Sequence, residues 1–145
     1  MTVLQNPLGL YIHWPFCLSK CPYCDFNTHV HDSIDHVRWR AAYLKTLSHY
    51  ANLTQGRTLT SVFFGGGTPS LMPPDMVADM ITHIKSLWDH DADIEISMEA
   101  NPTSVEVQKL AAFADAGVNR ISLGVQALND ADLKFLGREH SAGAA

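Results

Sequence analysis

The chain of 145 residues has no apolar run approaching the roughly 20 residues that an α-helix needs to cross a bilayer, so we predict no membrane-spanning segment. Residues 1–9 lack the basic stretch and long apolar core of a secretory signal. Basic residues are few: ten Lys and Arg stand against fifteen Asp and Glu, which gives a net charge of −5. Neither nucleic acid nor an anionic membrane attracts a net negative surface, so this balance disfavours both as the main partner.

Cysteine is scarce, but its positions are informative. Three cysteines cannot all be paired within one chain, and all three fall between positions 17 and 24. Such close spacing is typical of a set of ligands rather than of a disulfide framework. A reducing compartment keeps thiols of this kind free, so we predict a cytoplasmic location.

Strand-like and helix-like segments alternate along the chain. Apolar residues make up 46% of it and charged residues 17%, which is typical of a globular protein of one domain, or part of one. The predicted strands are residues 10–13, 61–64, 94–99 and 120–124. The predicted helices are residues 34–50, a segment from Pro73 to Trp88, a segment ending at Gly117, and a segment starting at Asn129 or Asp130. This βαβαβαβα order favours an α/β fold with a parallel sheet, either doubly wound or barrel-like.

Capping residues and apolar stripes define the predicted helices further. Asp32 or Ser33 is placed to cap the first helix. Thr103 with Glu106 fits a capping box that opens the third helix. The buried side of the first helix is predicted from its apolar period, which is Ile34, Val37, Ala41, Leu44 and Leu47. The apolar stripe predicted for the second helix is Met76, Val77, Met80, Ile81, Ile84, Leu87 and Trp88.

Four unusual chemical features follow the four predicted strands. The cysteines follow the first strand, Gly65–Gly67 follows the second, Glu99 ends the third, and Gln126 follows the fourth. Because the carboxyl ends of parallel strands meet at one edge, we expect these features to line one pocket. The glycine run has neither the Lys-Ser/Thr of a phosphate loop nor the spacing of a dinucleotide site. A tight turn between strand and helix is its alternative interpretation.

The cysteines have the spacing C-x3-C-x2-C, at Cys17, Cys21 and Cys24. Three thiolates on one loop can hold three irons of a [4Fe–4S] cluster and leave the fourth iron open. The alternative is a structural zinc site, which needs a fourth ligand from His13, His29 or His31.

Five segments together carry a resemblance to a known family. They are Tyr11-Ile-His-Trp-Pro-Phe-Cys17, the cysteine motif, Phe64-Gly-Gly-Gly-Thr-Pro69, Glu99-Ala-Asn-Pro102 and Asn119-Arg-Ile-Ser-Leu-Gly-Val-Gln126. In this order and spacing they resemble the radical S-adenosylmethionine (SAM) superfamily. The nearest branch contains oxygen-independent coproporphyrinogen III oxidase and heme chaperones of the HemW type. The resemblance implies a parallel partial TIM-type barrel that binds a [4Fe–4S] cluster and SAM.

The resemblance also implies roles for single residues. The three cysteines match the cluster ligands. The positions that match SAM contacts are Tyr11, Tyr23, Gly66, Gly67, Thr68, Glu99, Gln126 and Arg138. Each has a simpler interpretation: Tyr11 fits core packing, Tyr23 fits an apolar shield over the cluster, and Glu99, Gln126 and Arg138 fit surface or capping positions. No residue is assigned a catalytic role, and His13 is expected to be a packed histidine.

One departure selects the branch. The oxidase commonly has a fourth cysteine two residues after the third, where this sequence has Phe26. The run from Cys21 to Asn27 instead resembles the heme chaperones. The leading hypothesis is therefore a chaperone that carries heme to respiratory apoproteins and takes electrons from a separate donor. The alternative is the oxidase, an enzyme that decarboxylates two propionates of coproporphyrinogen III to vinyls.

The family comparison also sets an expectation for domain organisation. A radical SAM core resembles about six βα units, and this chain supplies about four. We expect residues 1–145 to be the N-terminal portion of that core. The sheet is then expected to be open along the fourth strand, and the C-terminal domain linked to heme binding is expected to be absent.

Overall fold

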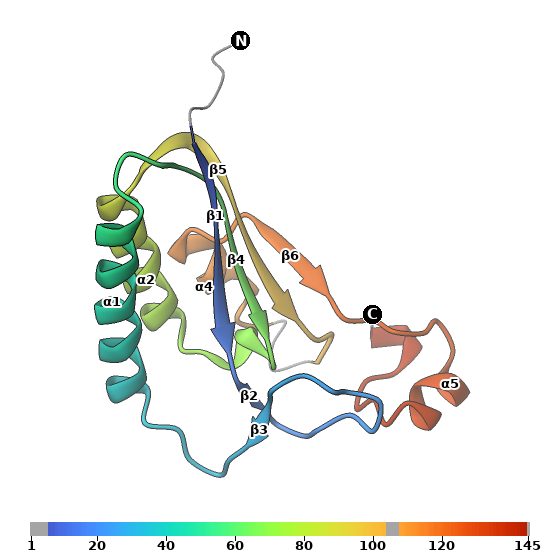
Figure 1. Ribbon diagram of the computed structural model, residues 1–145. Coiled ribbons are helices and arrows are strands. Elements are labelled where there is room, and N and C mark those ends of the chain that lie inside the picture. Colours follow the sequence, from blue (N-terminus) through green and yellow to red (C-terminus); the bar gives the residue numbers. More distant parts are fainter. Residues whose placement is uncertain (1–5, 104–107, 145) are drawn as a thin grey trace.

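The structure, a computed structural model, describes residues 6–103 and 108–144. Its main feature is a parallel sheet in the order β1-β4-β5-β6 (Figure 1). A short parallel pair, β2-β3, lies beyond β1. The elements are β1 (Pro7–Trp14), β2 (Phe16–Cys17), β3 (His29–Val30), α1 (His36–Leu53), β4 (Thr58–Gly66), the 3-10 turn η1 (Pro69–Leu71), α2 (Pro74–Leu87), β5 (Asp89–Ala100), α4 (Leu110–Ala116), β6 (Arg120–Leu123), α5 (Asp130–Phe135) and the 3-10 turn η2 (Ala142–Ala144).

The strand order selects one of the two predicted architectures. Successive strands of the main sheet are also neighbours in space, and every pair is parallel. A doubly wound sheet instead reverses its strand order at a switch point. Helices α1, α2 and α4 lie on the same side of the sheet (Figure 1). The fold is therefore the partial barrel of βα units that the sequence predicts, with about four units present.

Alternating side chains build the hydrophobic core. Ile12 and Trp14 of β1, Phe64 of β4 and Met98 of β5 are buried between the sheet and the helices. Helix α2 contributes its predicted apolar stripe, of which Met76, Val77, Met80, Ile81 and Ile84 are buried. Apolar side chains recur every 3.6 residues in the helix and every second residue in the strands. They therefore form one apolar helix face that packs on one apolar face of the sheet.

The prediction for the first helix is wrong in its cap and only partly right in its buried side, since Leu47 is buried and Ile34 and Leu44 pack against the core. The N-cap is Asp35, whose side chain accepts a hydrogen bond from Arg38 N at 3.0 Å, and not Asp32 or Ser33. Val37 of the predicted stripe is 81% exposed. The helix turns Trp39 and Tyr43 toward the core because both rings pack against Trp14. Aromatic packing thus decides the buried side of α1.

Several predicted boundaries also differ from those observed, some being too short and some too long. Strand β1 extends beyond residues 10–13, β4 continues through Gly66, and β5 begins at Asp89 because its start pairs with Thr58. Strand β6 ends one residue before the prediction. Trp88 caps α2 from outside the helix, and Leu136 likewise caps α5.

The structure confirms the predicted termini of two helices, and a third predicted cap lies partly outside the described residues. Gly117 ends α4 with a φ of 108°, a left-handed conformation that glycine adopts readily. Asn129 caps α5, and its side chain accepts from Asp132 N at 2.9 Å. The capping box of Thr103 and Glu106 cannot be followed, since Glu106 lies outside the described residues. Within the described part of the chain, no helix has both the length and the apolar character to cross a membrane.

Candidate cofactor pocket

A cavity of about 390 Å³ lies at the carboxyl ends of the parallel strands. It brings together every predicted site residue except Tyr11: Cys17, Cys21, Tyr23, Cys24, Gly66, Gly67, Thr68, Glu99, Gln126 and Arg138. The side chains that carry charge or hydrogen-bonding groups come from segments that are far apart in the sequence. The prediction that the four strand ends share one pocket is therefore confirmed as geometry.

The cysteine loop is anchored at both ends. It leaves β2 at Cys17 and returns at β3, and Phe16 pairs with His29 across that short ladder. The backbone N–H of His29 also donates to Pro15 O at 2.7 Å. All three cysteines are free and partly exposed. Within the loop, Cys24 N donates to Cys21 O at 3.0 Å, which forms a turn between the second and third cysteines.

The glycine segment is fitted directly beneath that loop. Gly67 N donates to Trp14 O at 2.7 Å, and Thr68 N donates to Phe16 O at 2.8 Å. A Cβ atom on Gly67 would lie 2.6 Å from Phe16 O, a clash with backbone. Gly66 has a φ of 114°, and its Cβ would meet Trp14 O at 2.8 Å. Glycine is therefore required here by the close approach of two protein backbones as well as by any ligand.

Thr68 and Glu99 link the glycine segment to the other walls of the pocket. Thr68 Oγ1 donates to Cys17 Sγ at 3.5 Å. Glu99, at the end of β5, accepts from Gly66 N at 3.1 Å through Oε2. Its other carboxylate oxygen has no hydrogen bond among the described residues, so Glu99 retains capacity to accept one from a ligand.

Tyr11 does not line the cavity. Its side chain is 56% exposed, its ring stacks on Phe63, and its hydroxyl contacts His13 Nδ1 at 3.1 Å. Burial, and then the charge of Glu99, raise the pKa of Tyr11 above its ordinary value. His13 is part-buried, as expected, and its Nε2 contacts Asn27 O at 3.2 Å. Tyr11 therefore lies beside the site, coupled to it through Glu99.

Gln126 lines the cavity in a strained conformation. Its φ of 69° is left-handed, a region that residues other than glycine rarely adopt. The cost is of order 1–3 kcal/mol and persists only where the surrounding structure enforces it. Such strain at the wall of a pocket is typical of functional sites.

Arg138 spans the pocket from the segment after α5. Nη2 donates to Asn101 Oδ1 at 2.6 Å and to Gly124 O at 2.8 Å, and Nη1 lies 3.4 Å from Cys21 Sγ. Nη1 also lies 3.4 Å from the hydroxyl oxygen of Tyr23. Burial and a hydrogen bond to Cys21 raise the pKa of Tyr23, against the lowering effect of Arg138.

Asn101 is the site residue that sequence reasoning missed. It lies two residues after Glu99, lines the cavity, and contacts both Arg138 and, through Nδ2 at 3.5 Å, Thr68 Oγ1. Its position just beyond the end of a strand is the signal that could have identified it.

The donor set fits a cluster with a bound amino-acid ligand better than a zinc site. His13, His29 and His31 line a second cavity, with Trp39 and Tyr43, and none of them lines the cysteine pocket. Among residues 6–103 and 108–144, no three His, Cys, Asp or Glu side chains are grouped around one metal ion. A [4Fe–4S] cluster instead places each thiolate on a separate iron. Arg138 Nε is buried without an acceptor among the described residues, a donor that a ligand carboxylate would satisfy.

Comparisons with known proteins agree with this geometry. A 44% identical relative is the radical S-adenosyl methionine domain-containing protein 1, mitochondrial, of Bos taurus, matched over 92% of this chain and 30% of its own length. The heme chaperone HemW of Haemophilus influenzae is 43% identical over 94% of this chain and 37% of its length. The solved structure of coproporphyrinogen III oxidase from Escherichia coli, a radical SAM enzyme, matches with a TM-score of 0.79 and 30% identity, over 98% of this chain and 33% of that one.

The chain thus spans about a third of the length of the curated relatives it matches. The family profile of the radical SAM superfamily matches residues 11–144, nearly the whole chain. Since that match includes the cysteine loop, the glycine segment and Arg138, the chain belongs to the radical SAM superfamily.

Proposed function

We propose that this chain forms the cofactor-binding portion of a heme chaperone, with a [4Fe–4S] cluster and SAM in the cysteine pocket. Both cofactors are implied by membership of the radical SAM superfamily. One observation carries the proposal: three free thiols, a glycine segment, a carboxylate and a guanidinium line a single cavity at the strand ends.

Each wall of the cavity has a proposed task. Cys17, Cys21 and Cys24 would hold three irons and leave the fourth open. When bound there, such a cluster would supply one-electron reduction chemistry to SAM. The protein groups bind and orient: Glu99 suits the ligand amine or ribose hydroxyls, and Arg138 Nε suits its carboxylate.

The remaining walls complete the proposed binding site. Backbone polar groups of Gly66 and Gly67, together with Thr68, suit the methionyl end of SAM. Tyr23 and Gln126 line the cavity at its cysteine side and its β6 side. Tyr11 lies outside the cavity, so we propose that it acts on the site only through Glu99.

The residue two positions after the third cysteine favours the heme chaperone over the oxidase. Phe26 occupies the position where the oxidase commonly has a fourth cysteine, and it lines the same cavity. The 43% identical relative from Haemophilus influenzae is named a heme chaperone. The proposed cargo is heme or a related porphyrin, the proposed recipients are respiratory apoproteins, and a separate donor reduces the cluster in the cytoplasm.

The oxidase is the second candidate. The fold match to coproporphyrinogen III oxidase from Escherichia coli supports it, because the same core serves both functions. In either case we propose that residues 1–145 are the N-terminal portion of a radical SAM core. The share of each relative that the chain matches supports this assignment.

Anaerobic reconstitution of the chain with iron and sulfide tests the cluster site. We expect visible absorption and stoichiometric iron and sulfide in the wild type, and loss of both in Cys21→Ala. Uptake of zinc without sulfide, or an unchanged spectrum in Cys21→Ala, would contradict the cluster assignment.

A second experiment separates chaperone from oxidase in the longer protein that contains this segment. That protein, reconstituted and supplied with SAM and reductant, is incubated with heme or with coproporphyrinogen III. We expect heme to elute with the protein from a sizing column and coproporphyrinogen to be recovered unchanged. Formation of protoporphyrinogen would establish the oxidase instead.

A further inference from the structure

The guanidinium of Arg138 is directed at the sulfur of a proposed cluster ligand. Arg138 Nη1 lies 3.4 Å from Cys21 Sγ, although the two residues are 117 positions apart. The segments that carry them lie side by side (Figure 1). Ser19 Oγ donates to Glu139 Oε1 at 3.0 Å, and a Cβ on Gly137 would lie 2.9 Å from the Pro22 ring. The contact is therefore part of a wider docking of the two segments.

Two acceptors on the opposite side fix the direction of the guanidinium. Nη2 is held by Asn101 Oδ1 at 2.6 Å and by Gly124 O at 2.8 Å. Asn101 is itself connected to Thr68 Oγ1 at 3.5 Å. Because the guanidinium is planar and rigid, two bonds at Nη2 determine where Nη1 points.

The three cysteine sulfurs have unequal surroundings. Cys17 Sγ receives a neutral donor, the hydroxyl of Thr68, at 3.5 Å. Cys21 Sγ receives a donor that carries a full positive charge. Charge-assisted hydrogen bonds are about twice as strong as neutral ones. Among the described residues, Arg138 is thus the charged side chain that donates to one of these sulfurs.

We propose that Arg138 raises the reduction potential of the cluster through Cys21, and that Asn101 is the residue that positions Arg138 for this. The proposal rests on the proposed cluster site and goes beyond a role of Arg138 in binding the SAM carboxylate. Reduction adds one electron, and hence one negative charge, to the cluster and its sulfurs. A cation and an N–H donor at Cys21 stabilise that added charge more than they stabilise the oxidised state.

Potentiometric titration of the reconstituted chain, with the reduced state followed by electron paramagnetic resonance, measures this effect. We expect Arg138→Gln to lower the ratio of reduced to oxidised cluster about tenfold at a fixed potential. For one electron this corresponds to a midpoint about 59 mV more negative. Arg138→Lys keeps the charge without the planar fork, so its midpoint is expected between those of the wild type and Arg138→Gln.

The positioning role of Asn101 has its own readout. Asn101→Ala should move the midpoint in the same direction as Arg138→Gln. If Asn101 acts on the cluster through the guanidinium, and not through its contact with Thr68, the double variant should match Arg138→Gln alone. Additive shifts in the double variant would overturn the role of Asn101. Lys134→Gln is the matched control, since Lys134 lies on α5 and is exposed, and its side chain makes no hydrogen bond or ion pair among the described residues.

The outcomes separate this inference from the proposed function. A wild-type chain that takes up no iron and sulfide contradicts the cluster site itself. A wild-type cluster whose midpoint is unchanged in Arg138→Gln, Arg138→Lys and Asn101→Ala contradicts only the tuning by Arg138. If Arg138→Gln fails to retain its cluster, Arg138→Lys and Asn101→Ala supply the same comparison.

Discussion

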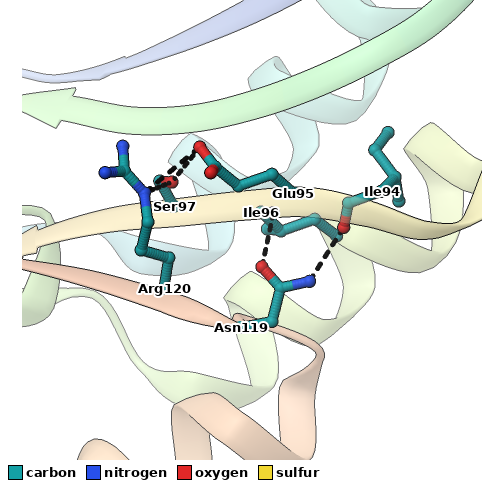
Figure 2. Close-up of polar contacts among 6 residues, drawn as sticks. All are labelled: Ile94, Glu95, Ile96, Ser97, Asn119 and Arg120. Carbon is teal, nitrogen blue, oxygen red and sulfur yellow. Dashed lines mark hydrogen bonds and ion pairs between the residues drawn. The ribbon is translucent and has the colours of Figure 1, made fainter.

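Asn119 binds both the backbone N–H and the backbone carbonyl of Ile96. Its backbone N–H donates to Ile96 O at 3.0 Å. Its side-chain Oδ1 accepts from Ile96 N at 2.8 Å (Figure 2). Its Nδ2 donates to Ile94 O at 2.8 Å. One side chain thus continues the ladder of β5 before β6 begins. This interaction sets the register in which Ser97 and Arg120 then pair.

Asn119→Ala should destabilise the chain by about 1–3 kcal/mol, because the N–H of Ile96 and the carbonyl of Ile94 lose their partners. Asn119→Asp keeps the acceptor for Ile96 N but sets a carboxylate oxygen against Ile94 O, so it should destabilise the chain as well. Urea unfolding followed by circular dichroism measures both. Equal stability of the wild type and Asn119→Ala would show that water replaces the side chain without cost.

Gly67→Ala should cost about 1–3 kcal/mol and weaken cluster uptake, since its Cβ would lie 2.6 Å from Phe16 O. The matched control is Gly9→Ala in β1, where the nearest atom, Ser61 Oγ, is at an ordinary 3.5 Å. That change should be neutral, or stabilising by up to about 1 kcal/mol. Thermal unfolding and iron content per chain provide the two measurements. Similar behaviour of the two variants would contradict the close-approach argument.

Phe113→Ala should destabilise by about 3–5 kcal/mol, because Phe113 of α4 is fully buried and its removal leaves a cavity. Phe135→Ala on α5 makes the same chemical change at a side chain that is 87% exposed. Its effect should stay below about 0.5 kcal/mol. Denaturant midpoints at equal m-values give the comparison. A large loss in Phe135→Ala would mean that something covers this ring in solution.

Tyr43→Phe should reduce stability by about 1 kcal/mol at neutral pH, because the hydroxyl donates to His13 O at 2.5 Å. Burial, and then the charge of Tyr11, raise the pKa of Tyr43 well above its ordinary value. In the unfolded chain a tyrosine has a pKa of about 10 and loses its proton above that pH. In the folded state Tyr43 still holds its proton there.

The contribution of Tyr43 to the free energy of unfolding is therefore fully present below a pH of about 10. It falls as the pH rises toward the folded-state pKa of Tyr43. Tyr43→Phe should make this alkaline decline shallower. Tyr50→Phe, at an exposed position of the same helix, is the control and should leave the decline as in the wild type. Unfolding free energies between pH 8 and 12 test the difference, and identical slopes for Tyr43→Phe and the wild type would refute it.

Local sequence signals predicted the order and kind of the elements well. Glycine at position 117 and asparagine at position 129 end and begin helices because their conformational and capping preferences are local. Periodicity located the apolar stripe of α2 for the same reason. For α1 it located Leu44 and Leu47 on the core side but not the whole buried side. Trp39 and Tyr43 pack on Trp14 and leave Val37 in solvent. Packing across elements overrode the local pattern there.

The sequence by itself determined the cysteine spacing, the glycine run and the alternation of strands and helices, since each depends on neighbours within a few residues. From strand ends alone it also predicted a shared pocket. Only the tertiary structure decided that Tyr11 lies outside that pocket, that Asn101 belongs to it, and that Arg138 reaches Cys21. Those relations join residues up to 117 positions apart, and their distances depend on how the whole sheet and its loops pack.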